Sequence, residues 1–544
     1  MDGVPVLSPA LSDVFLPGHI GELTQVVPTE LVDAILEETK TRERRLRDLP
    51  SRVGVYFVLA LGLFEHVGAA LVWQKLTGGL PGTVSAPSEK ALRDLRRRIG
   101  PLPMQRLFEV LAGPLGQPST PGVRYRGWRT VAFDGCGSIA VPDHGRNRGW
   151  LGHTLARFGH GGFPKLMLMT LCETGTRGLI AAAFGPTAAG ELAYARRLVP
   201  RLGDDMLLLG DRAFDSNRLL EEVAAKGAQF LVRCKSSRRF PVLTLLPDGS
   251  YLTRIGSLNL RVIEATVRAR TTDGSRIGDT YRLLTTLTDH RTDPAFRLVH
   301  LYHERWEVES AYLALRHTLL KGRVLRSKDP VGVTQEMWGL LTLYQALRSA
   351  MVTAVETRPG CDPDRAGFTV ALEAARDTVV RATGTVPATL LDGGLDLVGH
   401  IGTAVLHALL PARRPRLSTR IVKCGISRYH TWNRDDRPLA STPITKIDIE
   451  VQSPAPPSPQ TPTTPPASGR GGRWDMVSRI FAADPDRPRT AKEIATDLGI
   501  SGSKPFNSIS TQLGLWSRRG LLHRTAPSTY KLVLPTNWTP TPSP

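Results

Sequence analysis

The stretch Thr130-Val-Ala-Phe-Asp134-Gly-Cys136 is a run of β-branched and aromatic residues that ends in an acid followed by glycine. A second apolar run, Met206-Leu-Leu-Leu-Gly-Asp211-Arg212, also ends in an acid. Apolar runs of this length, bounded by turn residues, predict buried strands of a mostly parallel sheet. Because sites in open α/β sheets lie beyond the strand ends, Asp134 and Asp211 are candidate site residues. Either aspartate taken alone would more often be a turn or helix-cap residue.

A third acid lies in a segment of helix composition that has no proline or glycine between residues 300 and 320. On a regular helix, the side chains within roughly 40° of Glu309 would add an aromatic hydroxyl and two guanidiniums to its carboxylate: Tyr302, Arg305 and Arg316. Glu304 and Glu307 would fall on the opposite side, so only Glu309 can act with the basic row. The alternative is an amphipathic core helix whose charges form i,i+4 ion pairs.

Two carboxylates on strands and one on a helix would make an oxygen-only site suited to Mg²⁺ or Mn²⁺. Two such ions about 4 Å apart stabilise both the entering and the leaving oxygen of a phosphodiester during in-line displacement. The sequence therefore predicts that Asp134, Asp211 and Glu309 are catalytic ligands of two divalent ions.

The spacing of these residues resembles a known family. The motifs are Asp134-Gly, then Leu209-Gly-Asp211-Arg-Ala-Phe-Asp, then Tyr302-x2-Arg305-x3-Glu309-x6-Arg316. They resemble the DDE transposases of bacterial insertion sequences, most closely the fourth insertion-sequence family, whose signature is Tyr-x2-Arg-x3-Glu-x6-Lys. The resemblance covers about residues 10–350. It implies an α/β, ribonuclease-H-like core, two divalent metal ions and cut-and-paste DNA transposition.

Carried over by position, the resemblance makes Asp134, Asp211 and Glu309 the metal-binding triad. It also implies that Tyr302, Arg305 and Arg316 hold the phosphates of the transposon ends. Arg316 stands where the family pattern has lysine, which keeps the charge but replaces a point charge by a forked donor. Cys136 stands where a small hydroxyl residue is commoner. Neither departure removes a metal ligand.

The composition of the 544-residue chain favours a polyanionic partner, because the formal net charge is +20 and the pI is about 10.2. The partner we expect is double-stranded DNA, as transposon ends and as target. The apolar run Val53–Phe64 is too short to span a bilayer, and no signal peptide is visible, so we expect no membrane partner. Five cysteines without C-x-x-C spacing suggest reduced thiols in the cytoplasm, with the bacterial nucleoid as the place of action.

The N-terminal part, residues 1–125, is predicted to be a helical, DNA-binding transposase domain. Its segment Ser88–Arg98 presents a basic helical face, which could contact DNA backbone or could equally be a solvated surface. Residues 126–355 are predicted to form the ribonuclease-H-like catalytic core. In this core Asp215 is interpreted as a helix cap.

Within the core, a strand at Gln229–Lys235 ends in two cations, Arg233 and Lys235. They would flank the DNA channel, or would simply be edge-strand charges. Residues 236–290 alternate in polarity and contain turn signals, which predicts an antiparallel β insert. The resemblance implies that such an insert handles a flipped end base and a hairpin, with Tyr251 and Tyr281 as candidates.

The rest of the chain is predicted to have three parts: a helical and basic extension of the core at 356–440, a Pro/Ser/Thr-rich linker at 441–472, and a winged helix-turn-helix at 473–535. In the last part, Asn507 could reach base edges and Arg524 could contact phosphates. The alternative is a winged helix used for protein contact. Such a module is not standard in the resembled family.

We therefore expect a DNA transposase, an Mg-dependent endonuclease and strand transferase that moves an insertion sequence by phosphodiester hydrolysis and strand transfer through a hairpin end. A homodimer is expected in the DNA complex. The alternative is a DNA-binding regulator, or a domesticated transposase that lacks catalysis.

Overall fold

The chain divides into two compact units, residues 1–454 and 455–544, and each is described by itself. The computed structural model describes residues 18–43, 45, 49–80, 84, 86–153, 155–156, 159–160, 162–235, 237–271, 276–384, 398–412, 444–453, 473–484, 486–500, 503–518 and 521–532. In that part of the chain, no helix is long and apolar enough to cross a membrane.

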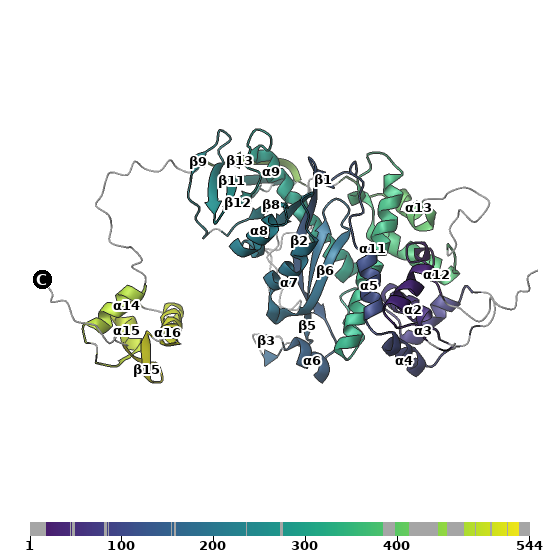
Figure 1. The fold of residues 1–544 in the computed structure, drawn as a ribbon, viewed down its shortest axis with the longest axis horizontal. Helices are drawn as coiled ribbons and strands as arrows, with labels where there is room; N and C mark the ends of the chain where they lie inside the picture. The colour runs from purple at the N-terminus through teal and green to yellow at the C-terminus, as the bar shows by residue number, and fades with distance from the viewer. Residues whose placement is uncertain are drawn as a thin grey trace, which may run out of the picture. The chain divides into compact units, whose positions relative to one another are not determined.

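The first unit is built on a central mixed sheet (Figure 1). Strand β2 (Trp128–Ala140) pairs antiparallel with β5 (Lys165–Glu173), and β5 pairs antiparallel with β6 (Leu179–Pro186). On its other side β2 pairs parallel with β7 (Met206–Gly210), which pairs parallel with β8 (Gln229–Arg233). Three antiparallel strands followed by two parallel ones fit a ribonuclease-H-like core.

The prediction of a mostly parallel sheet was wrong, because only the β2–β7 and β7–β8 pairings among the described strands are parallel. The physical reason is the length of the connections. Only the short segment 174–178 separates β5 from β6, which permits a hairpin, whereas a parallel crossover needs a dozen or more residues.

The predicted β insert extends this sheet with antiparallel strands. They are β9 (Thr244–Leu245), β10 (Tyr251–Ile255), β11 (Leu258–Thr271) and β12 (Arg276–Thr285). Strand β12 joins the insert to the core by pairing antiparallel with β8. The antiparallel character predicted for residues 236–290 is thereby confirmed.

One strand lies where the sequence predicted a linker. Residues 444–451 form β13 (Ile444–Val451), which pairs antiparallel with β11, so the start of the predicted linker at 441–472 is wrong. The missed signal is a period-two alternation, in which Ile447, Ile449 and Val451 alternate with acids. Most of the remaining linker lies outside the described residues.

Helices cover both faces of the central sheet (Figure 1). On one face, α7 (Glu191–Leu198) and α8 (Asn217–Ala224) share a hydrophobic cluster with strand residues such as Phe133 and Leu208. On the other face, α10 (Trp306–Leu313) and α11 (Pro330–Glu356) share a cluster with Ala132, Cys136, Leu207 and Leu209. As far as Cys136, odd and even positions of β2 therefore face opposite layers, as strand geometry requires; a register shift between Cys136 and Ile139 ends this alternation.

The N-terminal part is helical, as the sequence predicted, and its core is continuous with that of the catalytic unit. The helices are α1 (Thr29–Glu38), α2 (Ser51–Leu63), α3 (Ala69–Thr77), α4 (Glu89–Ile99) and α5 (Leu102–Leu111). Helices α2 and α5 pack directly against α11, which is buried along most of its length. The long helix α11 thus joins the N-terminal helices to the sheet.

The segment predicted as a helical extension contains α12 (Phe368–Arg381) and α13 (Gly399–His407), which also pack against α11. Its basic stretch 413–423 lies outside the described residues.

The second unit contains three helices and a small antiparallel sheet in its described part. They are α14 (Arg473–Ala482), β14 (Arg489–Thr490), α15 (Ala491–Asp497), α16 (Ser503–Arg518), β15 (Leu522–Ala526) and β16 (Thr529–Leu532). A capping box starts α15, because Thr490 and Glu493 each bind the other's backbone N–H. Val477, Phe481, Ile494 and Leu513 form its core. These elements lie within the segment 473–535, for which the sequence predicted a winged helix-turn-helix.

Candidate active site

Strand register brings the two aspartates together. In the parallel pairing of β2 with β7, Ala132 lies opposite Leu209. Two residues further on, Asp134 and Asp211 continue the same register and the same face, because side chains alternate along a strand. Asp211 follows β7 directly, as predicted. Asp134, however, lies within β2, which continues to Ala140, so its predicted place at a strand end was wrong.

Helix α10 brings Glu309 to this face of the sheet, where it packs against β2. The Tyr312 hydroxyl donates a hydrogen bond to the backbone oxygen of Asp134 at 2.5 Å. It also shares a 3.0 Å hydrogen bond with the hydroxyl of Thr170, which is the partner of Asp134 in the β2–β5 pairing. Since Tyr312 lies three residues after Glu309, these bonds fix the side of the helix that also carries Glu309.

The three acids are electrostatically coupled. The pKa of Asp134 is raised to about 7, mainly by burial; Arg305 opposes the rise, and the negative charges of Glu309 and Asp211 add to it. The buried Arg305 guanidinium donates to Glu309 at 3.2 Å. The surrounding charges of Asp134, Glu309 and Asp211 hold the pKa of Arg305 above its ordinary value despite burial. Glu309 and Asp211 are therefore close enough to Asp134 for their negative charges to raise its pKa.

The donor set fits a hard divalent cation by its chemistry, since all three candidate ligands are carboxylates. The pKa of Asp134 is raised to about 7 although Arg305 opposes the rise, so the positive charge of Arg305 only partly compensates the acids and a cation would supply more. Across the described residues, no three His, Cys, Asp or Glu side chains are already arranged to hold an ion. Glu309 accepts from Arg305, and its side chain is 44% exposed.

The basic row predicted on one regular helix is interrupted. Helix α9 (Ala295–Tyr302) is followed by a 3₁₀ turn at His303–Arg305, then α10, then a π-helix at Ala314–Leu319. The expectation of one continuous α-helix was therefore wrong. The half-buried Arg316 lies in this π-helix, where the 100° per residue used for the prediction does not apply, and such turns are frequent at functional sites.

Tyr302 is buried, and burial raises its pKa well above the ordinary value. Its ring packs edge-on against Tyr281 at 5.7 Å, and the Arg233 guanidinium lies 4.2 Å from the centre of the Tyr281 ring. In this conformation Tyr302 supports its neighbours and offers no open surface to a phosphate. Arg233 at the end of β8 is brought to the site by this stack.

The two tyrosines singled out in the insert lie on opposite faces. Tyr281 stacks next to Tyr302, whereas Tyr251 belongs to the cluster under α7 and α8 and donates to Glu264 at 3.2 Å. Only Tyr281 is therefore close to the acids.

Asp215 does not cap the start of α8 (Asn217–Ala224), so that prediction was wrong. The N-cap of α8 is Ser216, and Asp215 instead accepts from the backbone N–H of Lys235 at 3.0 Å and pairs with Arg238. Asp211 is the residue that caps a short helical turn, accepting from the N–H of Ala213 at 2.8 Å. The exposed Lys235 side chain lies just beyond β8.

The remaining predicted contacts belong to the second unit. Arg524 is exposed on β15 and donates weakly to the carbonyl of Ala526 at 3.4 Å. The backbone of Asn507 lies in α16, and its side chain is outside the described part of the chain.

Sequence reasoning missed two residues that hold the catalytic helix. Tyr312 was passed over, although it lies one turn from Glu309. Arg177 was also missed; it donates to Glu307 at 2.6 Å and pairs with Asp364, all three being buried. Glu307 is thus committed to the core, which agrees with the prediction that only Glu309 acts with the basic row.

Comparison with known proteins supplies the family. Residues 17–109 match the profile described as insertion element 4 transposase N-terminal, and residues 138–345 match the transposase DDE domain. The chain belongs to the insertion element 4 family of DDE transposases. The transposase DDE match includes Asp211 and Glu309 and begins just after Asp134. DDE transposases generally use divalent metal ions.

The transposase is 27% identical over 437 residues to the transposase InsG for insertion sequence element IS4 of Escherichia coli (strain K12). That similarity covers 78% of this chain and 97% of the relative. A solved piggyBac transposase synaptic complex with hairpin DNA aligns with a TM-score of 0.35 and 12% identity, over 73% of this chain and 85% of that one. By family, the chain is an insertion-sequence transposase, a DNA endonuclease and strand transferase whose substrate is DNA.

Proposed function

We propose that Asp134, Asp211 and Glu309 are the catalytic metal ligands of this transposase, holding two Mg²⁺ or Mn²⁺ ions. The observation that carries the proposal is the coupling of the three acids: the pKa of Asp134 responds to both Glu309 and Asp211. Strand register supports the pairing of the aspartates, and the Tyr312 bond to the backbone of Asp134 supports the position of the helix.

When bound, the ions would activate a water molecule and stabilise the leaving oxygen of a phosphodiester. The residues of the chain have separate tasks. Asp134 and Asp211 offer their oxygens from adjacent parallel strands, which hold them rigidly. Arg305 lies between the acids, balances their charge and orients Glu309 through its 3.2 Å hydrogen bond.

The proposed reaction runs in stages at one site. Water attacks a phosphorus atom at the transposon end, the P–O3′ bond breaks, and a free 3′-OH remains. That hydroxyl then attacks the opposite strand and forms a hairpin, which is reopened by a second hydrolysis. The new 3′-OH finally attacks target DNA, joining the element to it.

The proposed DNA contacts surround the acids. Arg233, Lys235 and Arg316 supply positive charge, and Tyr281 is the insert residue placed to stack on a displaced base. Arg305 orients Glu309 and neutralises charge, and the buried Tyr302 packs against its neighbours. Tyr302 would contact a phosphate only after a rearrangement that exposes it. A homodimer would give each of two ends its own set of acids, and the place of action would be the nucleoid in the bacterial cytoplasm.

We also propose that the second unit is a winged helix-turn-helix that binds DNA through α16, with Asn507 at base edges and Arg524 on phosphates. The order of its helices and its terminal hairpin support this reading.

The test is an Mg²⁺-dependent end-cleavage assay on Asp134→Ala, Asp211→Ala and Glu309→Ala. Each variant should bind the end but not cut it. Asp377→Ala, which removes an exposed acid of α12, is the matched control and should cut normally. Equal cutting by wild type and the three variants would overturn the proposal. Binding without cutting by the wild type would favour the regulator alternative.

A further inference from the structure

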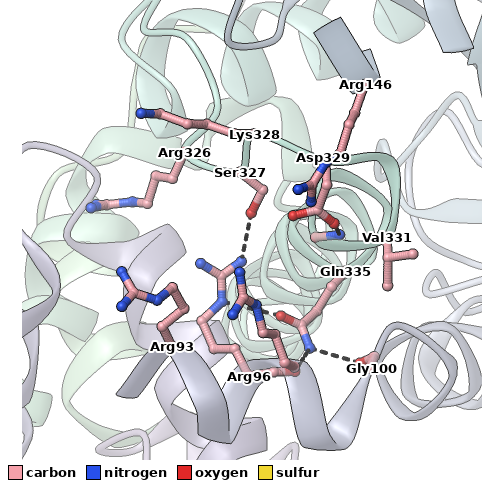
Figure 2. Close-up of a pocket in the computed structure, with 12 residues that line it drawn as sticks. Arg93, Arg96, Gly100, Arg146, Arg326, Ser327, Lys328, Asp329, Val331 and Gln335 are labelled. Atoms are coloured by element: carbon pink, nitrogen blue, oxygen red, sulfur yellow. Dashed lines mark hydrogen bonds between the residues drawn. The ribbon is translucent and has the colours of Figure 1, made fainter. Parts of the chain in front are cut away.

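A basic pocket of about 720 Å³ lies apart from the acids (Figure 2). Three segments far apart in the sequence line it: helix α4, the start of α6 (Gly145–Leu151), and the loop that leads into α11. Six cations face it, namely Arg93, Arg96, Arg97, Arg146, Arg326 and Lys328, against a single lining acid, Asp329. Arg93, Arg96 and Arg97 belong to the basic face of Ser88–Arg98, for which the sequence left open a contact to DNA backbone. Arg146, Arg326 and Lys328 belong neither to the triad nor to any predicted DNA contact.

Three of these six cations form ion pairs or hydrogen bonds with other residues of the chain. Arg96 pairs with Glu336 at 3.0 Å, Arg97 lies 3.8 Å from Asp94, and Arg326 donates to main-chain carbonyls. The Asp329 carboxylate caps α11 by accepting from the N–H of Gly332 at 3.0 Å. Its negative charge therefore interacts with the positive end of that helix.

The other three are not committed. Arg93, Arg146 and Lys328 are exposed, and none has a side-chain hydrogen bond or ion pair to any residue that the structure describes. Each comes from a different lining segment, and all three reach the same hollow (Figure 2). Three uncompensated cations around one pocket favour an anionic ligand with several charges.

Hydrogen bonds connect the three segments that carry these cations. Gln335 donates to the carbonyl of Gly100 at 2.7 Å and to that of Arg96 at 2.9 Å, which ties α11 to α4. The buried Asn147 donates to the carbonyl of Ser327 at 3.1 Å, which ties α6 to the loop. The spacing of the cations is therefore set before any ligand arrives, which lowers the entropic cost of binding.

Strand β2 connects this pocket with the acids. It runs from Asp134 to Ala140, whose carbonyl accepts from the N–H of Leu325 at 3.1 Å, next to the lining loop. Six residues of strand span about 20 Å, which is about six base pairs of duplex. One DNA molecule is thus long enough to reach both places on the same protomer.

We propose that this pocket binds the phosphate backbone of the transposon-end duplex, about six base pairs from the phosphodiester that is cut. The proposal rests on the proposed active site for the position of the cut. Arginine forks and a lysine suit phosphate oxygens and read no bases. The end duplex is the occupant because it must be held in place before the first cleavage, on the protomer that carries the acids.

The test compares the full chain with the triple variant Arg93→Ala/Arg146→Ala/Lys328→Ala, using fluorescence anisotropy in EDTA. The probes are two end duplexes, one extending about twelve base pairs inward from the cut and one only four. The variant should bind the longer duplex roughly 10- to 100-fold more weakly, with a salt slope smaller by about 2 to 3. The shorter duplex should bind both proteins alike.

The matched control is Lys226→Ala/Arg254→Ala/Arg381→Ala, which removes three exposed cations elsewhere and should leave the difference between the duplexes unchanged. Melting temperatures within about one degree of wild type would establish folding, since all six side chains are exposed. Unchanged affinity and slope for the longer duplex would overturn the proposal, as would equal loss on both duplexes. Normal end binding with defective joining to target DNA would assign the pocket to the target instead.

Failure here is distinguishable from failure of the proposed active site. Binding in EDTA needs no catalysis, and Glu309→Ala should keep the full preference for the longer duplex.

Discussion

Replacing Asp134 by asparagine should make the metal-free protein more stable while abolishing cleavage. The folded protein raises the pKa of this carboxyl from 3.8 to about 7. Between these pH values the folded state holds a proton that the unfolded state has lost, so stability falls as pH rises and the loss is complete above about pH 8. Asparagine carries no charge and removes that loss.

The magnitude follows from the shift. Three pKa units at 1.36 kcal/mol each give about 4 kcal/mol at pH 8 and about 2 kcal/mol at pH 5 as upper limits. Because Asp134 is only half-buried, water screens part of this, and we expect about 2 to 3 kcal/mol at pH 8. At about 2 cal/mol/K per residue, a unit of this size shifts its melting temperature by about 1 °C for each kcal/mol.

The assay is calorimetry in EDTA at pH 5 and pH 8. Asp134→Asn should melt about 2 to 3 °C above wild type at pH 8 and about 1 °C above it at pH 5. Adding Mg²⁺ should stabilise the wild type and narrow the gap, because the ion binds only the ionised set. Asp215→Asn is the control; it weakens the buried pair with Arg238 and should lower stability at both pH values. The reasoning would be refuted if Asp134→Asn were no more stable than wild type at pH 8. It would also be refuted if the difference in melting temperature did not increase from pH 5 to pH 8.

Three further outcomes are expected. Tyr312→Phe should bind DNA ends normally yet need several-fold more Mg²⁺ for half-maximal cleavage, because α10 loses its tie to Asp134; an unchanged Mg²⁺ requirement would count against that role. Arg177→Met should lower the melting temperature by roughly 3 to 5 °C, since it leaves the carboxylates of Glu307 and Asp364 buried without their cation. A smaller decrease would show that these ion pairs contribute little to stability. Cleavage at limiting Mg²⁺ should rise with pH up to about 7 to 8 as Asp134 ionises, and a flat profile from pH 6 to 8 would argue against Asp134 as a ligand.

The sequence predicted the parts of the site that depend on local patterns. Two apolar runs predicted strands whose register brings Asp134 beside Asp211, and helix composition placed Glu309 with Arg305. It could not predict the π turn that contains Arg316, because that turn depends on how the helix packs and not on its composition. It misjudged the sheet direction because connection length decides pairing, and length is known only once strand ends are known.

Contacts between residues far apart in the sequence were the other part of the site that the sequence could not predict. The bond from Tyr312 to the backbone of Asp134 and the pairs of Arg177 join residues more than 100 positions apart, and no local pattern marks them. Only part of the pocket could be predicted from the sequence. The basic face of α4 is evident there, but its proximity to Arg146 and Lys328 is not.

The strand at Ile444–Val451 has a practical consequence for anyone who wishes to study the catalytic unit alone. A chain ended at residue 440, where the sequence suggests a natural stop, would strip β11 of its outer neighbour and leave a long row of unsatisfied amides and carbonyls. Such a fragment would be prone to self-association through that bare edge. Ending it at residue 453 instead keeps the sheet complete, so the choice of thirteen residues decides whether the preparation stays monodisperse.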